Sequence, residues 1–255
     1  MRRSRTLEKL RNNEVVRILS LGHYIPSYVH IATHFGFDTI WLDLEHKYLD
    51  DAEVQALLGR FHLCDIDAMV RPSTLEKSKL CRYLEEGASG LMIPHVSTLE
   101  KANMIVDSVK FPPLGDRGID PGAFDNDYNL GSGDYVEHAN RETFVVLQIE
   151  TPQAVENADA IAAVEGVDAL FIGLADLGLR LGNNQQSLEQ AIETIAAAAR
   201  NRGIAWGCPT FTGEQMRQRA NQGAQLLAAG SETMALKQVC GEWRQMLDAA
   251  TRSNG

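Results

Sequence analysis

The sequence has no paired cysteines, no long apolar run and no excess of basic charge. Its four cysteines, Cys64, Cys81, Cys208 and Cys240, form no CxxC pair. This argues against a zinc knuckle or a disulfide framework and favours thiols in a reducing compartment. No apolar run reaches the roughly 20 residues of a membrane span. The basic N-terminal segment MRRSRTLEKLRNNE lacks an apolar core, so we expect no signal peptide and a cytoplasmic location.

The charge balance narrows the class of partner. The chain carries 24 Lys and Arg against 34 Asp and Glu, a net charge of −10. That balance argues against nucleic acid or an anionic membrane as the main partner. It leaves room for a small anionic substrate, because a metal ion or an arginine reverses the local field inside a cleft.

Short apolar runs alternate with longer helical patterns along the whole chain. The eight expected strands are Val15–Gly22, Asp38–Glu45, Asp67–Pro72, Ser89–Pro94, Thr143–Glu150, Val167–Gly173, Ile204–Cys208 and Ala224–Gly230. Helices between them are expected to start at Asp50, Thr74, Thr98, Thr151, Ser187 and Thr212. Eight such units in 255 residues predict one (β/α)8 barrel domain over 1–255. The alternative, an open doubly wound sheet, is weakened because GxGxxG is absent.

Polar residues follow four of the expected strands. They are Asp43, Glu45 and His46 after the second, Arg71 in the third, Gln148 and Glu150 in the fifth, and Asp176 after the sixth. A barrel enzyme carries its chemistry at the C-terminal ends of its strands. We therefore expect these side chains to converge at one mouth.

Glu150 and Asp176 are the candidate metal ligands. The period of two in a strand places Val146, Gln148 and Glu150 on one face, so Glu150 is expected to point into the mouth. Two neighbouring carboxylates repel each other, and a divalent cation removes that conflict. Only two protein oxygens leave positions for water and substrate, which suits Mg²⁺ or Mn²⁺. The alternative is that Glu150 caps the next helix and Asp176 caps a turn.

The other strand-end residues suit acid–base chemistry and anion binding. A histidine beside carboxylates, as His46 lies beside Asp43 and Glu45, can act as a general base. The Arg71 fork suits a carboxylate, and Gly173 allows backbone to approach a ligand. The alternatives are a solvated surface turn at 43–46, a structural salt bridge for Arg71 and a packing role for Gly173.

Six segments resemble the HpcH/HpaI aldolase family. They are Phe37–Lys47 (FDTIWLDLEHK), Val70–Ser73 (VRPS), Glu86–Val96 (EGASGLMIPHV), Phe111–Gly118 (FPPLGDRG), Gln148–Pro152 (QIETP) and Glu165–Leu177 (EGVDALFIGLADL). The resemblance implies a (β/α)8 barrel and a metal-dependent pyruvate aldolase using Mg²⁺ or Mn²⁺, with Co²⁺ as a further candidate. It also implies a homo-oligomer, a hexamer built from dimers that exchange the C-terminal helix.

The resemblance carries over to particular residues. Glu150 and Asp176 match the family's metal ligands, His46 and Asp43 match its base and supporting acid, and Arg71 matches the arginine at the pyruvate.

The remaining matches surround the bound oxo acid. They are Gln148 and the backbone around Gly173 and Ala175, and Glu45 is placed to tune His46 or a metal-bound water. The implied reaction is reversible cleavage of a 4-hydroxy-2-oxo acid to pyruvate, or a related 2-oxo acid, and an aldehyde through a metal-stabilised enolate. Two alternatives stay open: another metal-enolate reaction, of decarboxylase or acyl-CoA lyase type, and a barrel that binds an oxo acid without turnover.

Several positions depart from the family pattern. Leu174 stands where proline is usual, Gly178 where serine is frequent, and Glu85 where the family has aspartate. The segment Ile119–Gly133 also lacks the usual pattern, within a long irregular stretch, Phe111–Asp134, that is expected to be functional or a subunit contact. These departures indicate a retained oxo-acid half of the site and a changed aldehyde half.

Overall fold

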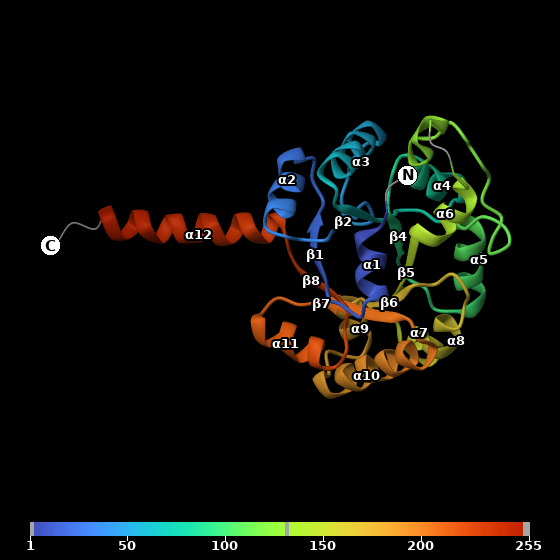
Figure 1. Cartoon of the computed structure of the whole chain (residues 1–255). Helices are drawn as coiled ribbons and strands as arrows, with labels where there is room; N and C mark the ends of the chain where they lie inside the picture. Colours follow the sequence, from blue (N-terminus) through green and yellow to red (C-terminus); the bar gives the residue numbers. More distant parts are fainter. Residues whose placement is uncertain (1–2, 131–132, 252–255) are drawn as a thin grey trace.

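The computed structural model, which describes residues 3–130 and 133–251, is a closed barrel of parallel strands in sequence order (Figure 1). The strands are β1 (Val16–Leu21), β2 (Thr39–Asp43), β3 (Asp67–Arg71), β4 (Gly90–Ile93), β5 (Phe144–Ile149), β6 (Ala169–Ile172), β7 (Ala205–Pro209) and β8 (Leu226–Ser231). Because β8 pairs with β1, the predicted (β/α)8 barrel is confirmed and the open doubly wound alternative is wrong.

Helices precede, connect and follow the strands. They are α1 (Arg5–Arg11), α2 (Pro26–His34), α3 (Asp51–Cys64), α4 (Lys77–Glu85), α5 (Leu99–Val109), the 3-10 turn η1 (Phe124–Asn129), α6 (Tyr135–Glu142), α7 (Pro152–Glu156), α8 (Ala158–Ala162), α9 (Leu174–Arg180), α10 (Gln185–Arg202), α11 (Gly213–Asn221) and α12 (Glu232–Thr251). No helix in the described part of the chain is long and apolar enough to cross a membrane.

Side-chain caps explain most of the helix starts. Four expected starts are confirmed by side chains that accept a backbone N–H of the first turn: Asp50, Thr98, Thr151 and Thr212. Two expectations were wrong. The helix expected from Thr74 begins at Lys77, and Asn184 rather than Ser187 caps α10.

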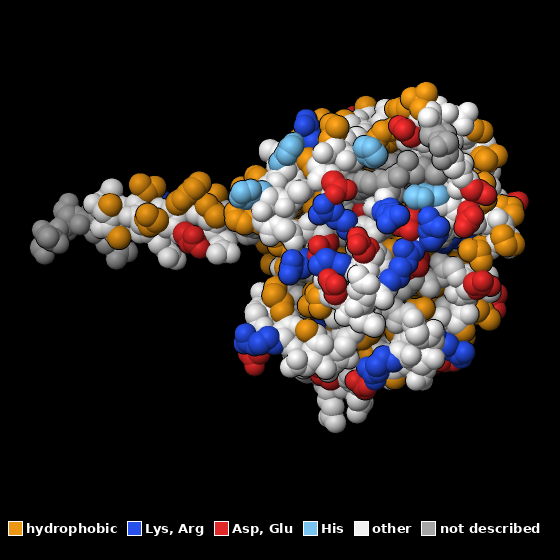
Figure 2. Space-filling model, viewed as in Figure 1, with side chains coloured by type: hydrophobic (Ala, Val, Ile, Leu, Met, Phe, Trp, Pro, Cys, Tyr) orange, Lys and Arg blue, Asp and Glu red, His pale blue; other side chains and the backbone are white. Residues whose placement is uncertain are grey.

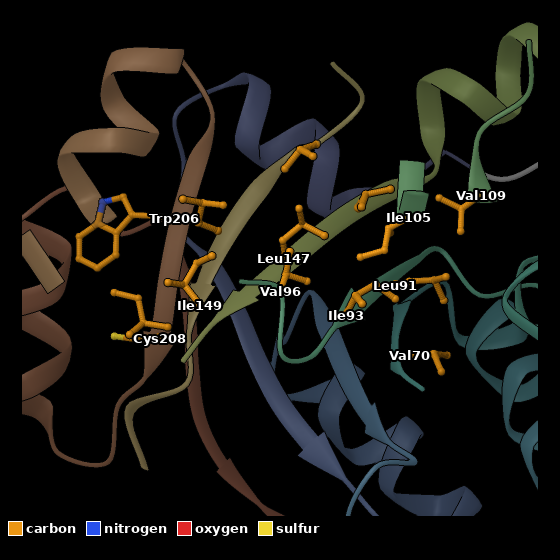
Figure 3. Packing of buried hydrophobic residues seen from close by; sticks show 14 of the residues in the cluster. Val70, Leu91, Ile93, Val96, Ile105, Val109, Leu147, Ile149, Trp206 and Cys208 are labelled. Atoms are coloured by element: carbon orange, nitrogen blue, oxygen red, sulfur yellow. The ribbon is translucent and has the colours of Figure 1, made fainter. Parts of the chain in front are cut away.

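The strands β2 to β7 are largely buried on both faces, whereas β1 and β8 are partly exposed. Inward side chains fill the barrel, among them Met69, Met92, Phe144, Val146 and Phe171. Outward side chains pack beneath the helices, and Figure 3 shows part of this layer, including Val70, Leu91, Leu147 and Ile149. The expected alternation in β5 is therefore confirmed: Val145, Leu147 and Ile149 face the helices, and Val146 faces the interior.

One end of the barrel is covered by α1. The Thr6 N–H donates to Asp67 Oδ2 at the start of β3 (2.8 Å), and the Ser4 N–H donates to Glu142 Oε2 just before β5 (3.0 Å). Leu7 joins the interior cluster. These contacts lie at the N-terminal ends of the strands. The helix therefore covers that end of the barrel, and the mouth at the C-terminal ends, where the candidate site residues lie, stays uncovered by it.

The described part of the irregular stretch, residues 111–130 and 133–134, also lies away from that mouth, because the stretch connects α5 with the start of β5. It is held by a buried ion pair between Arg117 Nη2 and Asp125 Oδ2 (3.0 Å), and the Tyr135 hydroxyl donates to the same oxygen (2.8 Å). A pocket of about 300 Å³ is lined by η1, α6 and residues 87–89 at the barrel base. Residues 131–132 of the unusual segment lie outside the described residues.

Candidate active site

Glu150 lies directly after β5 and is 2% exposed. Its Oε1 accepts a hydrogen bond from the His95 backbone N–H (2.7 Å), whereas Oε2 accepts none from the described residues. Burial raises the pKa of the Glu150 carboxyl, and the negative charges of Asp176 and Glu45 add to this while His95 opposes it. A cation bound between these carboxylates would relieve the repulsion.

Gly173 makes room for this carboxylate. A Cβ at position 173 would lie 2.4 Å from Glu150 Oε2 and 2.8 Å from Gln148 Nε2. Gln148 is 3% exposed, and its Oε1 has no hydrogen-bond partner among the described residues. A buried acceptor left without a donor is costly unless a ligand or water supplies one. Gln148, Glu150 and Gly173, at the ends of the fifth and sixth strands, therefore line a recess that we call the cradle. The Gln148 Oε1 acceptor inside it is unused by any described residue.

Asp176 lies in the first turn of α9, one residue after the exposed Ala175. Its Oδ1 accepts a hydrogen bond from Arg180 Nη1 at 2.7 Å, one turn further along the helix. Arg180 Nη1 also lies 3.5 Å from the Glu150 carbonyl oxygen. Asp176 Oδ2 has no hydrogen bond to the described residues, so each of the two expected metal ligands keeps one free oxygen.

Arg71 holds the opposite side of the mouth. Its Nε and Nη2 donate to the two oxygens of Asp43, both at 2.9 Å, and Nη1 lies 3.2 Å from Glu45 Oε2. The guanidinium lies 4.5 Å from the centroid of the Trp41 ring. The strand register pairs Asp43 with Arg71, which explains their contact.

His46 is exposed at the mouth. Its Nε2 lies 3.6 Å from Glu45 Oε2, and its side chain is 61% exposed. Asp43 Oδ1 contacts the backbone N–H of His46 at 3.4 Å rather than the imidazole ring. The carboxylate beside the ring is thus Glu45, whereas the resemblance gave the supporting role to Asp43.

The sequence analysis did not single out His95. Its Nδ1 lies 2.7 Å from Glu150 Oε1 and its Nε2 lies 3.1 Å from Glu45 Oε1. It also missed Lys101, whose Nζ donates to the His95 carbonyl oxygen at 2.8 Å. The one available signal was position, because His95 follows Pro94 at the end of the fourth expected strand.

The departures from the family pattern lie around the site rather than in it. Leu174 packs against the outer core, and a Cβ at Gly178 would meet only ordinary contact, with Leu188 at 3.9 Å. Glu85 ends α4 and lines a groove with Asp120, in the segment that returns to the barrel base.

The donor set fits a hard divalent cation. Carboxylate oxygens are the ligands that Mg²⁺ and Mn²⁺ prefer, and Glu150 and Asp176 each keep one oxygen free. No cluster of three or more His, Cys, Asp or Glu placed to hold a metal occurs within residues 3–130 and 133–251. A cation here would therefore keep several positions for water and substrate, as a catalytic site needs.

Comparisons with known proteins identify the family of the chain. The family model described as HpcH/HpaI aldolase/citrate lyase matches residues 20–238. A hydroxypyruvate/pyruvate aldolase from Pseudomonas aeruginosa is 29% identical, covering 98% of this chain and 97% of the relative. A 4-hydroxy-2-oxovalerate aldolase from Novosphingobium aromaticivorans is 32% identical, covering 91% of this chain and 90% of the relative.

A solved structure gives the same result at the level of the fold. The crystal structure of an HpcH/HpaI aldolase from Desulfitobacterium hafniense has a TM-score of 0.89 and 29% identity, covering 94% of this chain and 95% of that one. The family-model match over residues 20–238 includes every candidate site residue. The chain therefore belongs to the HpcH/HpaI aldolase/citrate lyase family and is a carbon–carbon lyase.

Proposed function

We propose that this lyase reversibly cleaves a 4-hydroxy-2-oxo acid to pyruvate, or a related 2-oxo acid, and an aldehyde. The observation that carries the proposal is the cradle at β5 and β6: a buried Glu150 with a free Oε2, the unpartnered Gln148 Oε1 and the gap at Gly173. The names of the relatives, which include hydroxypyruvate/pyruvate and 4-hydroxy-2-oxovalerate aldolases, support a 2-oxo acid as substrate.

Glu150 and Asp176 would hold Mg²⁺ or Mn²⁺, with Co²⁺ as a third candidate, through their free oxygens. When bound, the cation supplies Lewis acidity toward the keto and carboxylate oxygens of the oxo acid. Gln148 Oε1 would accept a hydrogen bond from a substrate hydroxyl or a water beside that cation. The backbone at Gly173 and Ala175 borders the same space and limits how the oxo acid lies.

His46 is proposed as the group that moves the proton. In the cleavage direction it takes the proton of the 4-hydroxyl as the C3–C4 bond breaks, and the aldehyde leaves. The bond's electron pair passes to the C2 carbonyl, and the resulting enolate takes a proton at C3. Glu45 orients the His46 ring, and Arg71, fixed by Asp43, balances the charge that develops on oxygen.

Proton exchange into pyruvate tests the enolate half of the reaction without knowledge of the aldehyde. The protein is incubated with pyruvate in heavy water and Mg²⁺ or Mn²⁺, and loss of the methyl signal is followed by NMR. We expect exchange in the wild type, none with a chelator, and none in Glu150→Ala. Glu156→Gln, an exposed change on α7, serves as the control and should exchange normally.

Two results would count against the proposal. Exchange without release of pyruvate from any 4-hydroxy-2-oxo acid would favour another enolate reaction. No exchange with any of the three metals would favour binding without turnover.

We also propose that the whole chain acts as one domain and assembles as a homo-oligomer, a hexamer, through exchange of α12 between subunits. Helix α12 projects away from the barrel (Figure 1) and carries apolar side chains along its length (Figure 2). Those exposed on it include Met234, Leu236, Trp243, Met246 and Leu247. A helix this apolar is unfavourable in water unless another surface covers it. The four free cysteines of the chain support the cytoplasm as the proposed location, because cysteines stay unpaired in a reducing compartment.

A further inference from the structure

We infer that His95 is a positioning residue that fixes the metal-binding carboxylate of Glu150 and connects it to the acid–base side of the mouth. The inference rests on the proposed metal site and adds a residue to it. His95 belongs to the loop between β4 and α5, and it reaches Glu150 after β5 and Glu45 after β2.

Two groups of His95 bind the same oxygen. The backbone N–H donates to Glu150 Oε1 at 2.7 Å, and the ring Nδ1 lies 2.7 Å from it. With Oε1 engaged twice, the carboxylate cannot rotate freely, and Oε2 is left facing the cradle at Gly173. His95 thus selects which oxygen of Glu150 is offered to a cation.

The backbone of His95 is unusual, which supports a built arrangement. Its φ is +56°, in the left-handed region that is uncommon for residues other than glycine, with asparagine, aspartate and histidine the most frequent among them. This conformation allows the N–H and the ring of one residue to approach the same oxygen. Such strain persists only where the surroundings enforce it.

The surroundings do enforce it. Lys101 Nζ, on the first turn of α5, donates to the carbonyl oxygen of His95 at 2.8 Å. The Val96 N–H donates to the Gln148 carbonyl oxygen at 3.3 Å, and the Asn157 side chain donates to the Ser97 carbonyl oxygen at 2.8 Å. The loop is therefore tied to α5, β5 and the junction of α7 and α8.

The other ring nitrogen extends the chain of contacts. Nε2 lies 3.1 Å from Glu45 Oε1, while Glu45 Oε2 contacts Arg71 and lies near His46. His95 therefore contacts both the Glu150 carboxylate and the Glu45 carboxylate, which lies beside the residue proposed to move the proton. His95 joins the two halves of the site in this way.

The test measures divalent-cation affinity by calorimetry with Mg²⁺ and Mn²⁺, so it needs no turnover. His95→Gly keeps the left-handed backbone and its N–H but removes the ring. We expect the affinity for both ions to fall roughly 10- to 100-fold, because the loss of a contact that supports a metal ligand typically has an effect of this size. Lys101→Met keeps the His95 ring but removes the hydrogen bond from Lys101 Nζ to the His95 carbonyl oxygen, and it should also lower the affinity for both ions. His34→Ala, an exposed change on α2, should leave affinity unchanged.

Electron spin echo of the Mn²⁺-loaded protein separates positioning from direct ligation. If His95 only positions Glu150, the wild type and His95→Gly should show the same nitrogen coupling to Mn²⁺. Unchanged affinity in both His95→Gly and Lys101→Met would overturn the inference, and so would a directly bound His95 nitrogen. If the wild type itself bound no divalent cation, the proposed metal site would fail, which is a different result. Thermal unfolding of each variant shows whether it is folded.

Discussion

Arg71 grips Asp43 with two parallel hydrogen bonds, Nε to Oδ1 and Nη2 to Oδ2, each 2.9 Å long. Both side chains are nearly buried, and the third guanidinium nitrogen contacts Glu45 at 3.2 Å. Most of the Arg71 donors are thus already used inside the protein. The protein therefore holds Arg71 in place, and in the proposed reaction its charge would act on the substrate from a fixed position.

Removing Arg71 should therefore cost stability as well as activity. Arg71→Met leaves Asp43 as a buried, unpaired charge, and we expect about 3 kcal/mol or more of unfolding free energy to be lost. Urea unfolding of the variant measures this.

A double-mutant cycle isolates the pair. Asp43→Asn combined with Arg71→Met should destabilise the protein by less than the sum of the two single changes, with a coupling of about 1–3 kcal/mol. Strict additivity would show that the two hydrogen bonds contribute little. Arg71→Lys should remain folded but impaired, since an ammonium cannot reproduce the fork.

Gly173→Ala tests the cradle. The added Cβ would meet Glu150 Oε2 at 2.4 Å and Gln148 Nε2 at 2.8 Å, so both side chains must move. We expect the affinity for Mn²⁺ to fall by at least about 10-fold, because the side chains that support the metal site would be displaced. We also expect overpacking to lower the free energy of unfolding by about 1–3 kcal/mol. Gly178→Ala, where the nearest atom would be 3.9 Å away, is the matched control. Full Mn²⁺ binding by Gly173→Ala would refute this account of the glycine.

Cys208 should resist alkylation far above neutral pH. Burial raises the pKa of its thiol from the ordinary 9.0 to about 11, and the side chain is fully buried beneath the helices (Figure 3). In a variant retaining only this cysteine, iodoacetamide at pH 9 should label the urea-unfolded chain quickly and the native chain hardly at all.

The raised pKa of Cys208 also makes the stability of the protein depend on pH. Above pH 9 the unfolded chain releases the thiol proton while the folded protein retains it, so the Cys208 contribution to stability declines as the pH rises from 9 toward 11. A Cys208→Ala variant should lack this part of the alkaline decline. Native labelling at the unfolded rate at pH 9 would contradict the assigned burial.

Helix α12 should decide the oligomeric state. Leu236, Trp243, Met246 and Leu247 recur at spacings of seven, three and one, so they form one apolar stripe along the helix. Trp243→Glu with Met246→Glu should shift the sedimenting mass toward that of one chain. Arg244→Ala, on the same helix and 76% exposed in its side chain, should not. Persistence of the assembly in the double variant would rule out α12 as its contact.

The strand-end residues were predictable because an alternating strand places every second side chain on one face. Gln148 follows Val146 into the interior, and Glu150 continues that face. That rule does not identify the partners of these residues. The family resemblance implied that Asp43 supports His46, and the register of β2 and β3 also places Asp43 beside Arg71. The sequence does not reveal register, since it depends on how the whole barrel closes.

His95 shows the same limit more sharply. A histidine after Pro94 carries no sign that its backbone will be left-handed, because that conformation is imposed by Lys101 and by contacts to Gln148 and Asn157. Local sequence is informative where local geometry decides, as at the Asp50 and Thr98 helix caps. It is silent where distant segments determine a torsion angle.

The sequence alone determined the barrel, its strands and the positions where chemistry would gather, since these follow from periodicity, chain length and the polarity of each strand end. Only the tertiary structure decided which oxygen of Glu150 is free, which acid pairs with Arg71 and that His95 joins the two sides of the mouth. Those outcomes depend on contacts between segments more than 20 residues apart, such as that from His95 to Glu150, and only the packed chain brings such segments together.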